Sequence, residues 1–125
     1  MYPNNDRVIT LLSASIKEMD LIGQMCADIS SPDDFVSSLH GLTTFRACGM
    51  SLQYVTENFV KIRNLMGVEF FNPYKEVPWK EVFDMRNFLS HEYGDADPEG
   101  IFNTVKEDIP TLLETTKHIL EDLGV

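Results

Sequence analysis

Apolar residues recur at steps of three and four along most of the 125-residue chain, which is the period of α-helices that bury one face. No segment keeps the strict alternation that a half-buried β-strand shows. In the first segment, residues 6–29, one face is apolar and the opposite face is polar. Its apolar positions are Val8, Leu12, Ile16, Met19, Ile22 and Cys26. The pattern predicts an all-α protein that begins with a one-sided core helix.

The second predicted helix starts at Ser31-Pro32-Asp33-Asp34 and ends before Gly67. Serine is a good N-cap, proline fits the first helical position, and acidic residues favour the positive end of a helix. A first apolar stripe consists of Phe35, Leu39 and Leu42. The stripe changes face after Gly41, where we expect a bend or break. A heptad-like seam, as bundles and helical dimers use, then comprises Phe45, Cys48, Leu52, Val55, Phe59, Ile62 and Met66.

The remaining chain predicts a connection and two more helices. Residues 67–77 are rich in aromatics that we expect to lie over the bundle. A third helix should run from Pro78 to about Tyr93, and Asp97-Pro98-Glu99 is a clear helix start. Pro110 should kink the last helix because its ring removes a backbone donor. The inward positions of that helix are Ile101, Val105, Ile109, Leu112, Leu113, Ile119 and Leu123. The expected fold is a single all-α domain, residues 1–125, built as an up-and-down bundle of four to five helices.

Composition narrows the classes of protein. The net charge of −10 repels phosphate backbones and argues against a broad nucleic-acid-coating surface, although a small basic pocket is compatible with it. No apolar run is long enough to cross a bilayer, and the N-terminus lacks the basic-then-apolar order of a secretory signal. We expect a cytoplasmic protein. Cys26 and Cys48 fall on apolar helix faces without a Cys/His cluster, which predicts buried free thiols rather than a zinc site.

Polar and charged residues cluster near the end of the third predicted helix. They are Arg86, Asn87, Ser90, His91 and Tyr93. At about 100° per residue, Ser90 and Tyr93 lie within about 40° of Arg86, whereas His91 is turned away by about 140°. Side chains five residues apart splay, so Arg86 and His91 converge poorly on one ligand within one chain, unless the helix ends at His91. Two copies facing each other across a twofold axis would bring them together, so the spacing favours a dimeric composite site.

These residue types suit the cleavage of a phosphodiester bond. His91 can take or give a proton near neutral pH. Arg86 can bind a phosphate with two hydrogen bonds and stabilise extra charge in the transition state. Asn87 and Ser90 can orient His91 or bind phosphate oxygens, and Tyr93 offers a hydroxyl for substrate contact or covalent modification. No carboxylate cluster or histidine pair of the metal-binding type accompanies them, which favours a mechanism without metal or cofactor, with the RNA 2′-hydroxyl as nucleophile.

The pattern Arg86-x4-His91-x-Tyr93 resembles the HepT-like (DUF86) branch of the HEPN superfamily. Flanking segments share the resemblance: Pro78-Trp79-Lys80-Glu81, Met85 and VKEDIP at 105–110. It implies helical bundles that dimerise through the motif helix at a shared cleft, and metal-independent ribonucleases that leave a cyclic phosphate. By position, Arg86 and His91 match the catalytic pair, and Asn87 matches the polar residue often found after the arginine.

The resemblance also implies a regulatory partner. HepT-like proteins are toxins of type VII toxin–antitoxin pairs, and a minimal nucleotidyltransferase, MntA-like, neutralises them by transferring AMP to the motif tyrosine, here Tyr93. The middle helix of the family often carries an Ile-Gly-Glu-Ala-like stretch, and Val55-Thr56-Glu57-Asn58 keeps only the acid.

Two alternatives stay open. An arginine and a histidine this close occur by chance on ordinary helix surfaces, although the tyrosine two positions later tightens the pattern. Acidic residues also surround the motif: Asp84, Glu92, Asp95, Asp97 and Glu99. They leave room for a catalytically inert member that keeps the fold and dimer, as a binding module or a nucleotidyltransferase-associated subunit. His40 and His118 lie apart in sequence, and we assign them no role.

Overall fold

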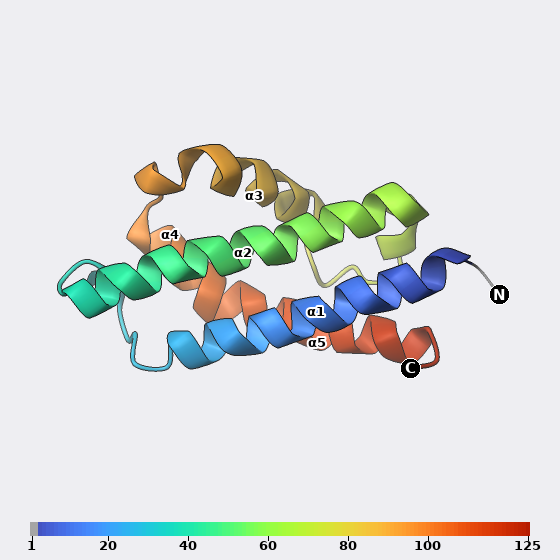
Figure 1. The fold of residues 1–125 in the computed structure, drawn as a ribbon, viewed down its shortest axis with the longest axis horizontal. Helices are drawn as coiled ribbons and strands as arrows, with labels where there is room; N and C mark the ends of the chain where they lie inside the picture. The colour runs from blue at the N-terminus through green and yellow to red at the C-terminus, as the bar shows by residue number, and fades with distance from the viewer. Residues whose placement is uncertain (1–2) are drawn as a thin grey trace.

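A computed structural model describes residues 3–125 and forms an α-helical bundle (Figure 1). The α-helices are α1 (Pro3–Met25), α2 (Leu39–Met66), α3 (Trp79–Glu92), α4 (Pro98–Asn103) and α5 (Ile109–Asp122). Short 3₁₀ segments η1 (Pro32–Phe35), η2 (Val68–Phe71) and η3 (Tyr93–Asp95) and a π turn, η4 (Thr104–Asp108), join them. The described residues contain no strand, and the predicted all-α bundle is confirmed. That residues 1–125 form a single domain stays a prediction.

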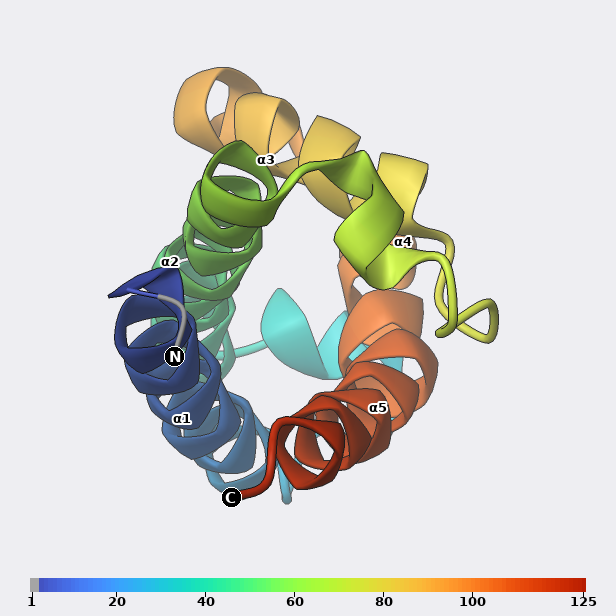
Figure 2. The ribbon, with the colours of Figure 1, turned by 90° about the vertical axis from the view of Figure 1, so that its right-hand side faces the viewer.

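The helices pack around one apolar core. α1 lies along α2 on one side and α5 on the other, and α3 lies on α2. Viewed along the bundle, η1 crosses its far end (Figure 2). The largest buried side chains are Phe35, Phe59, Phe71, Leu12, Met19, Ile22, Leu52, Ile62 and Ile119. The inward face predicted for the first helix is buried apart from the half-buried Ile16, although α1 ends at Met25, before the predicted end at residue 29.

The predicted start of the second long helix at Ser31 is wrong, and the break expected near Gly41 separates η1 from α2. Ser31 opens only the single turn of η1, whose Asp34 carboxylate accepts hydrogen bonds from the backbone N–H groups of Ser30 and Ser31. The backbone of Ser38 is extended, with φ −154° and ψ 163°, so no helix can pass through it. Its hydroxyl accepts a hydrogen bond from the Gly41 N–H at 2.9 Å and caps α2 instead.

The break therefore lies before Gly41, and the predicted stripe at this point is wrong as well. Phe35 is buried, but Leu39 is 81% exposed and Leu42 is 40% exposed, because Phe35 does not share a helix with them. Gly41 sits in the first turn of α2, where a Cβ would overlap the carbonyl oxygen of Asp34. The glycine permits close packing between η1 and α2 rather than a bend.

The seam and the aromatic connection follow the prediction. The central residues of the seam are buried, and Gly67 ends α2 with a positive φ of 87°. Phe71 and Tyr74 are buried over the bundle. The Trp79 indole, at the start of α3, donates a hydrogen bond to the Tyr74 carbonyl at 2.8 Å and packs against Phe71 with ring centroids 4.4 Å apart. This contact anchors the beginning of α3.

The last predicted helix begins and is interrupted where expected. The Asp97 carboxylate caps α4 by accepting from the Glu99 N–H. The helix widens into the π turn η4, which ends two residues before Pro110, and Pro110 has no N–H to donate to the preceding turn. Lys106 in this turn donates to the Cys26 carbonyl at 2.7 Å and ties it to the end of α1. Cys26 and Cys48 are buried free thiols, as predicted, with Sγ atoms 3.0 Å apart.

Candidate active site

Side chains of α3 meet the outer face of α2 at three successive levels. The three pairs are Glu57 with Arg86, Gln53 with Ser90, and Gly49 with Tyr93. From one pair to the next, the residue number on α2 falls by four. The residue number on α3 and η3 rises by four and then by three. The two helices are therefore antiparallel, and these three contacts show their register beside the apolar core.

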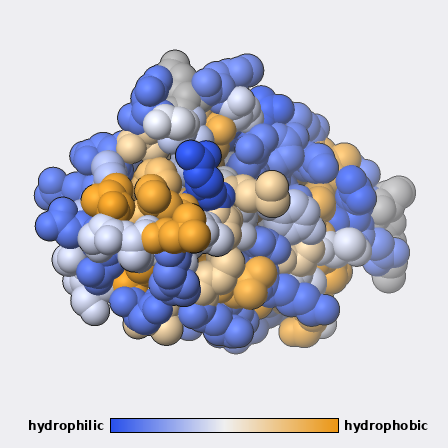
Figure 3. All heavy atoms as spheres, turned by 60° about the vertical axis from the view of Figure 1, so that its left-hand side comes forward, coloured by the Kyte–Doolittle hydropathy of each residue, from blue (hydrophilic) through white to orange (hydrophobic). Residues whose placement is uncertain are grey.

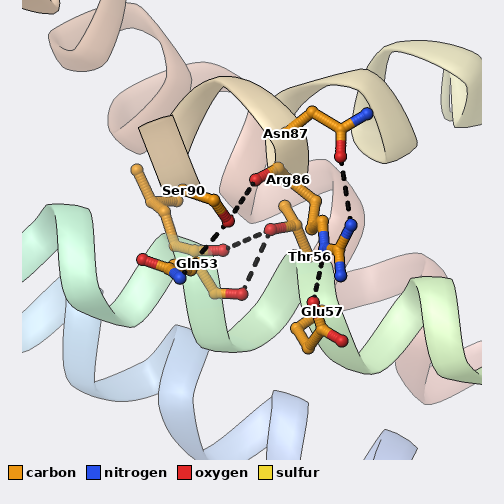
Figure 4. A network of polar contacts seen from close by, with 7 residues as sticks. Gln53, Thr56, Glu57, Arg86, Asn87 and Ser90 are labelled. Carbon is orange, nitrogen blue, oxygen red and sulfur yellow. Dashed lines mark hydrogen bonds and ion pairs between the residues drawn. The ribbon is translucent and has the colours of Figure 1, made fainter. Parts of the chain in front are cut away.

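Arg86 forms an ion pair in the site. Its Nε atom donates to Oε2 of Glu57 at 2.5 Å, and its Nη1 atom donates to Oδ1 of Asn87 at 3.1 Å (Figure 4). The side chains of Arg86 and Glu57 are 37% and 33% exposed, so the ion pair is partly shielded from water. A partly buried charge-assisted hydrogen bond of this kind holds the guanidinium in one orientation.

Ser90 lies one turn after Arg86. Its hydroxyl donates to the Arg86 carbonyl at 2.9 Å and accepts from Nε2 of Gln53 at 3.4 Å (Figure 4). Ser90 and Asn87 thus contact the backbone and side chain of Arg86. Neither has a hydrogen bond to His91 among the described residues.

Tyr93 begins η3 directly after α3 ends. Its ring stacks on Phe45 at a centroid distance of 4.9 Å and covers Gly49, and its hydroxyl donates to the Phe45 carbonyl. A Cβ on Gly49 would lie 2.5 Å from Cζ of the tyrosine. Burial is the main cause that raises the pKa of Tyr93, and the nearby Cys48 and Cys26 add to it. We call the surface formed by Phe45 and Gly49 the tyrosine seat.

His91 stands apart from this network. Its side chain is exposed and forms no hydrogen bond or ion pair with the side chains that the structure describes. The structure brings Arg86, Asn87 and Ser90 together, and it holds Tyr93 one level further along the same helix pair. It does not bring His91 to Arg86 within one chain, which agrees with the splayed spacing of five residues.

Sequence reasoning missed Glu57 and Gly49 as parts of the site. Gln53 and Glu57 are four positions apart and face outward from the apolar seam of α2, which is the spacing that two antiparallel partners on α3 require. That spacing is a usable signal for the Glu57 contact. Gly49 gives no such signal in the sequence, because the role of a helical glycine becomes visible only when the structure shows the ring that covers it.

A cavity of about 150 Å³ lies between α2, α3 and the last helix. Its walls are mostly apolar, Glu76, Glu81 and Asp108 contribute carboxylates, and none of the motif residues lines it. Burial, followed by the charges of Glu107 and Glu81, raises the pKa of Asp108. In the described part of residues 3–125, no group of three or more His, Cys, Asp or Glu side chains is placed to hold a metal ion. Within the same range, no helix has the length and apolarity needed to span a membrane.

Comparison with known proteins identifies the family. The model of the family described as HepT-like, Ribonuclease HepT-like, matches residues 9–119. The chain therefore belongs to the HepT-like ribonuclease family, as the motif and its flanking residues indicated.

Several relatives carry ribonuclease names. The chain is 30% identical over 112 residues to a Methanocaldococcus jannaschii protein named "Gamma-glutamylcyclotransferase and putative RNase", a match over 90% of this chain and 47% of the relative. It is 37% identical over 76 residues to a "Putative RNase" of Caldanaerobacter subterraneus subsp. tengcongensis, over 61% of this chain and 64% of the relative. It is 43% identical over 44 residues to a "Probable ribonuclease HepT" of Thermococcus cleftensis, over 35% of this chain and 40% of the relative.

The matches span about half the length of these relatives: 47%, 64% and 40%. No solved structure matches the chain significantly.

Proposed function

We propose that the protein is a metal-independent endoribonuclease whose catalytic residues are Arg86 and His91. The observation that carries the proposal is the complete motif, which runs along α3 into the first residue of η3, in a chain of the HepT-like ribonuclease family. The 2′-hydroxyl of an RNA nucleotide attacks the adjacent phosphorus and loses its proton to a base, and the 5′-oxygen leaves with a proton. His91 takes or gives a proton in these steps, and Arg86 stabilises the charge on the phosphate. The products are a 2′,3′-cyclic phosphate and a 5′-hydroxyl.

A homodimer through α3 completes this site in the proposal. His91 and Arg86 point apart within one chain, so a second copy must supply one of the two groups at each phosphate. Apolar side chains on the outer face of α2 and on α3 support such an interface: Leu39, Leu42, Met50, Tyr54 and Phe88 are exposed. Hydrophobic residues gather among hydrophilic ones on the face of the molecule that Figure 3 shows. The positions on α2 advance in helical steps toward Glu57, so a copy docked there would reach the motif.

A substitution within this surface tests the dimer. Met50, 78% exposed, changed to Asp should shift the protein from dimer to monomer in light scattering after size-exclusion chromatography. Leu21→Asp, at an exposed apolar position of α1, is the matched control and should stay dimeric. A wild-type monomer at micromolar concentration would contradict the composite site.

We further propose that the protein is the toxin of a toxin–antitoxin pair and that a minimal nucleotidyltransferase neutralises it. The Tyr93 oxygen attacks the α-phosphorus of ATP, AMP is joined to the tyrosine, and pyrophosphate leaves. The cytoplasm holds both ATP and the RNA substrate that these reactions need. Incubation with the cognate transferase and ATP should increase the intact mass by one AMP, and Tyr93→Phe should abolish the increase.

The activity is tested with purified protein and single-stranded RNA in EDTA. Wild type should cleave and leave 2′,3′-cyclic phosphate ends, and Arg86→Ala and His91→Ala should each lose at least about a hundredfold in rate. Lys80→Ala, which removes an exposed cation of α3 paired with Asp84, is the control and should remain active. Equal cleavage by wild type and both motif variants would exclude the proposed site.

A specific observation favours a second candidate. Glu57 already neutralises Arg86, and acidic residues surround the motif. A catalytically inert HEPN-like dimer, acting as a binding module or as a nucleotidyltransferase-associated subunit, fits this charge distribution. Stable association with the transferase, together with no RNA cleavage by any variant, would favour it.

A further inference from the structure

Glu57 binds only one of the three nitrogen atoms of the Arg86 guanidinium. The guanidinium has five N–H donors: one on Nε and two on each Nη atom. Glu57 accepts from Nε, and Asn87 accepts one N–H of Nη1. The three remaining N–H groups, on Nη1 and Nη2, have no acceptor among the described residues. The edge formed by the two Nη atoms can bind a phosphate with two parallel hydrogen bonds.

The contact between Glu57 and Arg86 is rigid because Glu57 belongs to a long helix. Glu57 lies well inside the 28-residue helix α2, flanked by the buried Thr56 and Asn58. One turn away, Gln53 binds Ser90, and Ser90 in turn binds the Arg86 carbonyl (Figure 4). Contacts to α2 therefore hold both the backbone and the side chain of Arg86 in place. An unrestrained arginine samples many rotamers, and misplacement of a reacting group by about 1 Å can cost about a hundredfold in rate.

We propose that Glu57 is the positioning residue of the phosphate site: it holds Arg86 through Nε so that the Nη edge faces the phosphate. The proposal rests on the proposed phosphodiester chemistry of Arg86. The opposite role is a competing anion that occupies Arg86 and must leave before RNA binds. A carboxylate on the Nη edge would compete with phosphate directly there, whereas Glu57 binds Nε and leaves Nη2 without an acceptor among the described residues.

Three variants separate these roles. Glu57→Ala removes the acceptor and the charge, whereas Glu57→Gln removes the charge but keeps an oxygen that can accept from Nε. Glu81→Gln removes one negative charge from α3 without a hydrogen bond to Arg86 in residues 3–125, so it measures the effect of charge alone. Circular dichroism and thermal unfolding first establish that each variant folds.

The first measurement does not need RNA cleavage. The Arg86 Nε–Hε signal, identified by its loss in Arg86→Lys, is followed by NMR during titration with inorganic phosphate. Removal of a negative charge by itself strengthens phosphate binding, so Glu81→Gln should bind as tightly as wild type or tighter. Glu57→Ala should bind several-fold more weakly than Glu81→Gln, and its Hε should exchange faster with water. Phosphate binding by Glu57→Ala that equals or exceeds that of Glu81→Gln would overturn the proposal in favour of competition.

The second measurement is RNA cleavage under single-turnover and steady-state conditions. Glu57→Ala should lower kcat at least about tenfold with a smaller change in KM, because orientation is lost rather than binding surface, and Glu57→Gln should recover most of the rate. Faster cleavage by both Glu57 variants would contradict positioning. If wild-type protein cleaves no RNA, the proposed ribonuclease function fails, and the phosphate titration still decides the role of Glu57.

Discussion

The Tyr93 hydroxyl donates a hydrogen bond to the Phe45 carbonyl while the two rings stack, so Tyr93 holds the end of α3 on α2. His91 lies two residues before this anchor and has no polar contact of its own within the described chain. The proposed acceptor of AMP is thus also a structural contact beside the proposed catalytic histidine. A phenol in this seat, partly buried and with a raised pKa, is a poor nucleophile until its ring leaves.

Gly49→Ala should disrupt the tyrosine seat. The new methyl group would lie 2.5 Å from Cζ and 2.7 Å from Cδ2 of Tyr93, so the ring must move. We expect a loss of about 1–3 kcal/mol in the free energy of unfolding, as for other overpacked sites, measured by urea denaturation. Gly23→Ala is the control because a Cβ there meets nothing within 4 Å. It should stabilise α1 by roughly 0.5–1 kcal/mol, since alanine is the better helix former.

The same variant tests how Tyr93 becomes available. If departure from the seat limits modification, Gly49→Ala should accept AMP faster than wild type from the transferase and ATP, followed by intact mass over time. Gly23→Ala should be modified at the wild-type rate. A slower reaction of Gly49→Ala would mean that the transferase acts on the seated ring.

Tyr93→Phe separates the hydroxyl from the ring. It keeps the stacking on Phe45 and loses the hydrogen bond to its carbonyl. We expect a loss of about 0.5–1.5 kcal/mol in unfolding free energy, with faster hydrogen exchange of the amides around His91. Tyr54→Phe, in which the lost hydroxyl belongs to an exposed ring, should leave exchange at His91 unchanged.

The helices were predictable because their signals are local. Gly67, Pro78 and Asp97 mark ends and starts that the structure confirms. The start of α2 was not predictable in this way, because Ser31 and Ser38 both fit an N-cap and only tertiary packing selects between them. The close approach of Gly41 to Asp34 selects Ser38 as the N-cap of α2. This contact joins residues of two different elements, α2 and η1.

The site was predictable only in part, for a related reason. Angular positions along one helix correctly separate Arg86 from His91, as their different surroundings show. They say nothing about the neighbouring helix, so Glu57 and the tyrosine seat required the register between α2 and α3. That register comes from packing of the core and from the anchor of Trp79 on the preceding loop.

Gly41→Ala should be strongly destabilising. A Cβ at this position would overlap the Asp34 carbonyl oxygen and lie 3.0 Å from its carbon, and both atoms are backbone. We expect a loss of about 1–3 kcal/mol or more in unfolding free energy. Gly100→Ala in α4 provides the comparison, because its nearest neighbour would be the Cβ of Asp97 at 3.9 Å. A Gly41→Ala protein as stable as Gly100→Ala would show that η1 can shift away at little cost.

Tyr74 should make stability depend on pH in the alkaline range. Its hydroxyl donates to Oδ2 of Asp122 at 2.7 Å. Burial raises the pKa of Tyr74 to about 12, and the hydrogen bond and charge of Asp122 contribute. The value in an unfolded chain is about 10. The folded protein therefore holds this proton more tightly, and the resulting stability is fully present below about pH 10 and lost as the pH rises toward about 12.

A comparison of wild type with Tyr74→Phe isolates this contribution. At pH 9 wild type should be the more stable protein in urea unfolding, since it keeps the bond to Asp122. Between about pH 10 and 12 the difference should shrink by at most about 1.4 kcal/mol per pH unit, the free-energy equivalent of one pKa unit. Tyr54→Phe controls for the loss of a phenol at an exposed position. A difference for Tyr74→Phe that stays constant or widens over this range would contradict the raised pKa, because only a phenol protonated in the folded state and ionised in the unfolded state produces the narrowing.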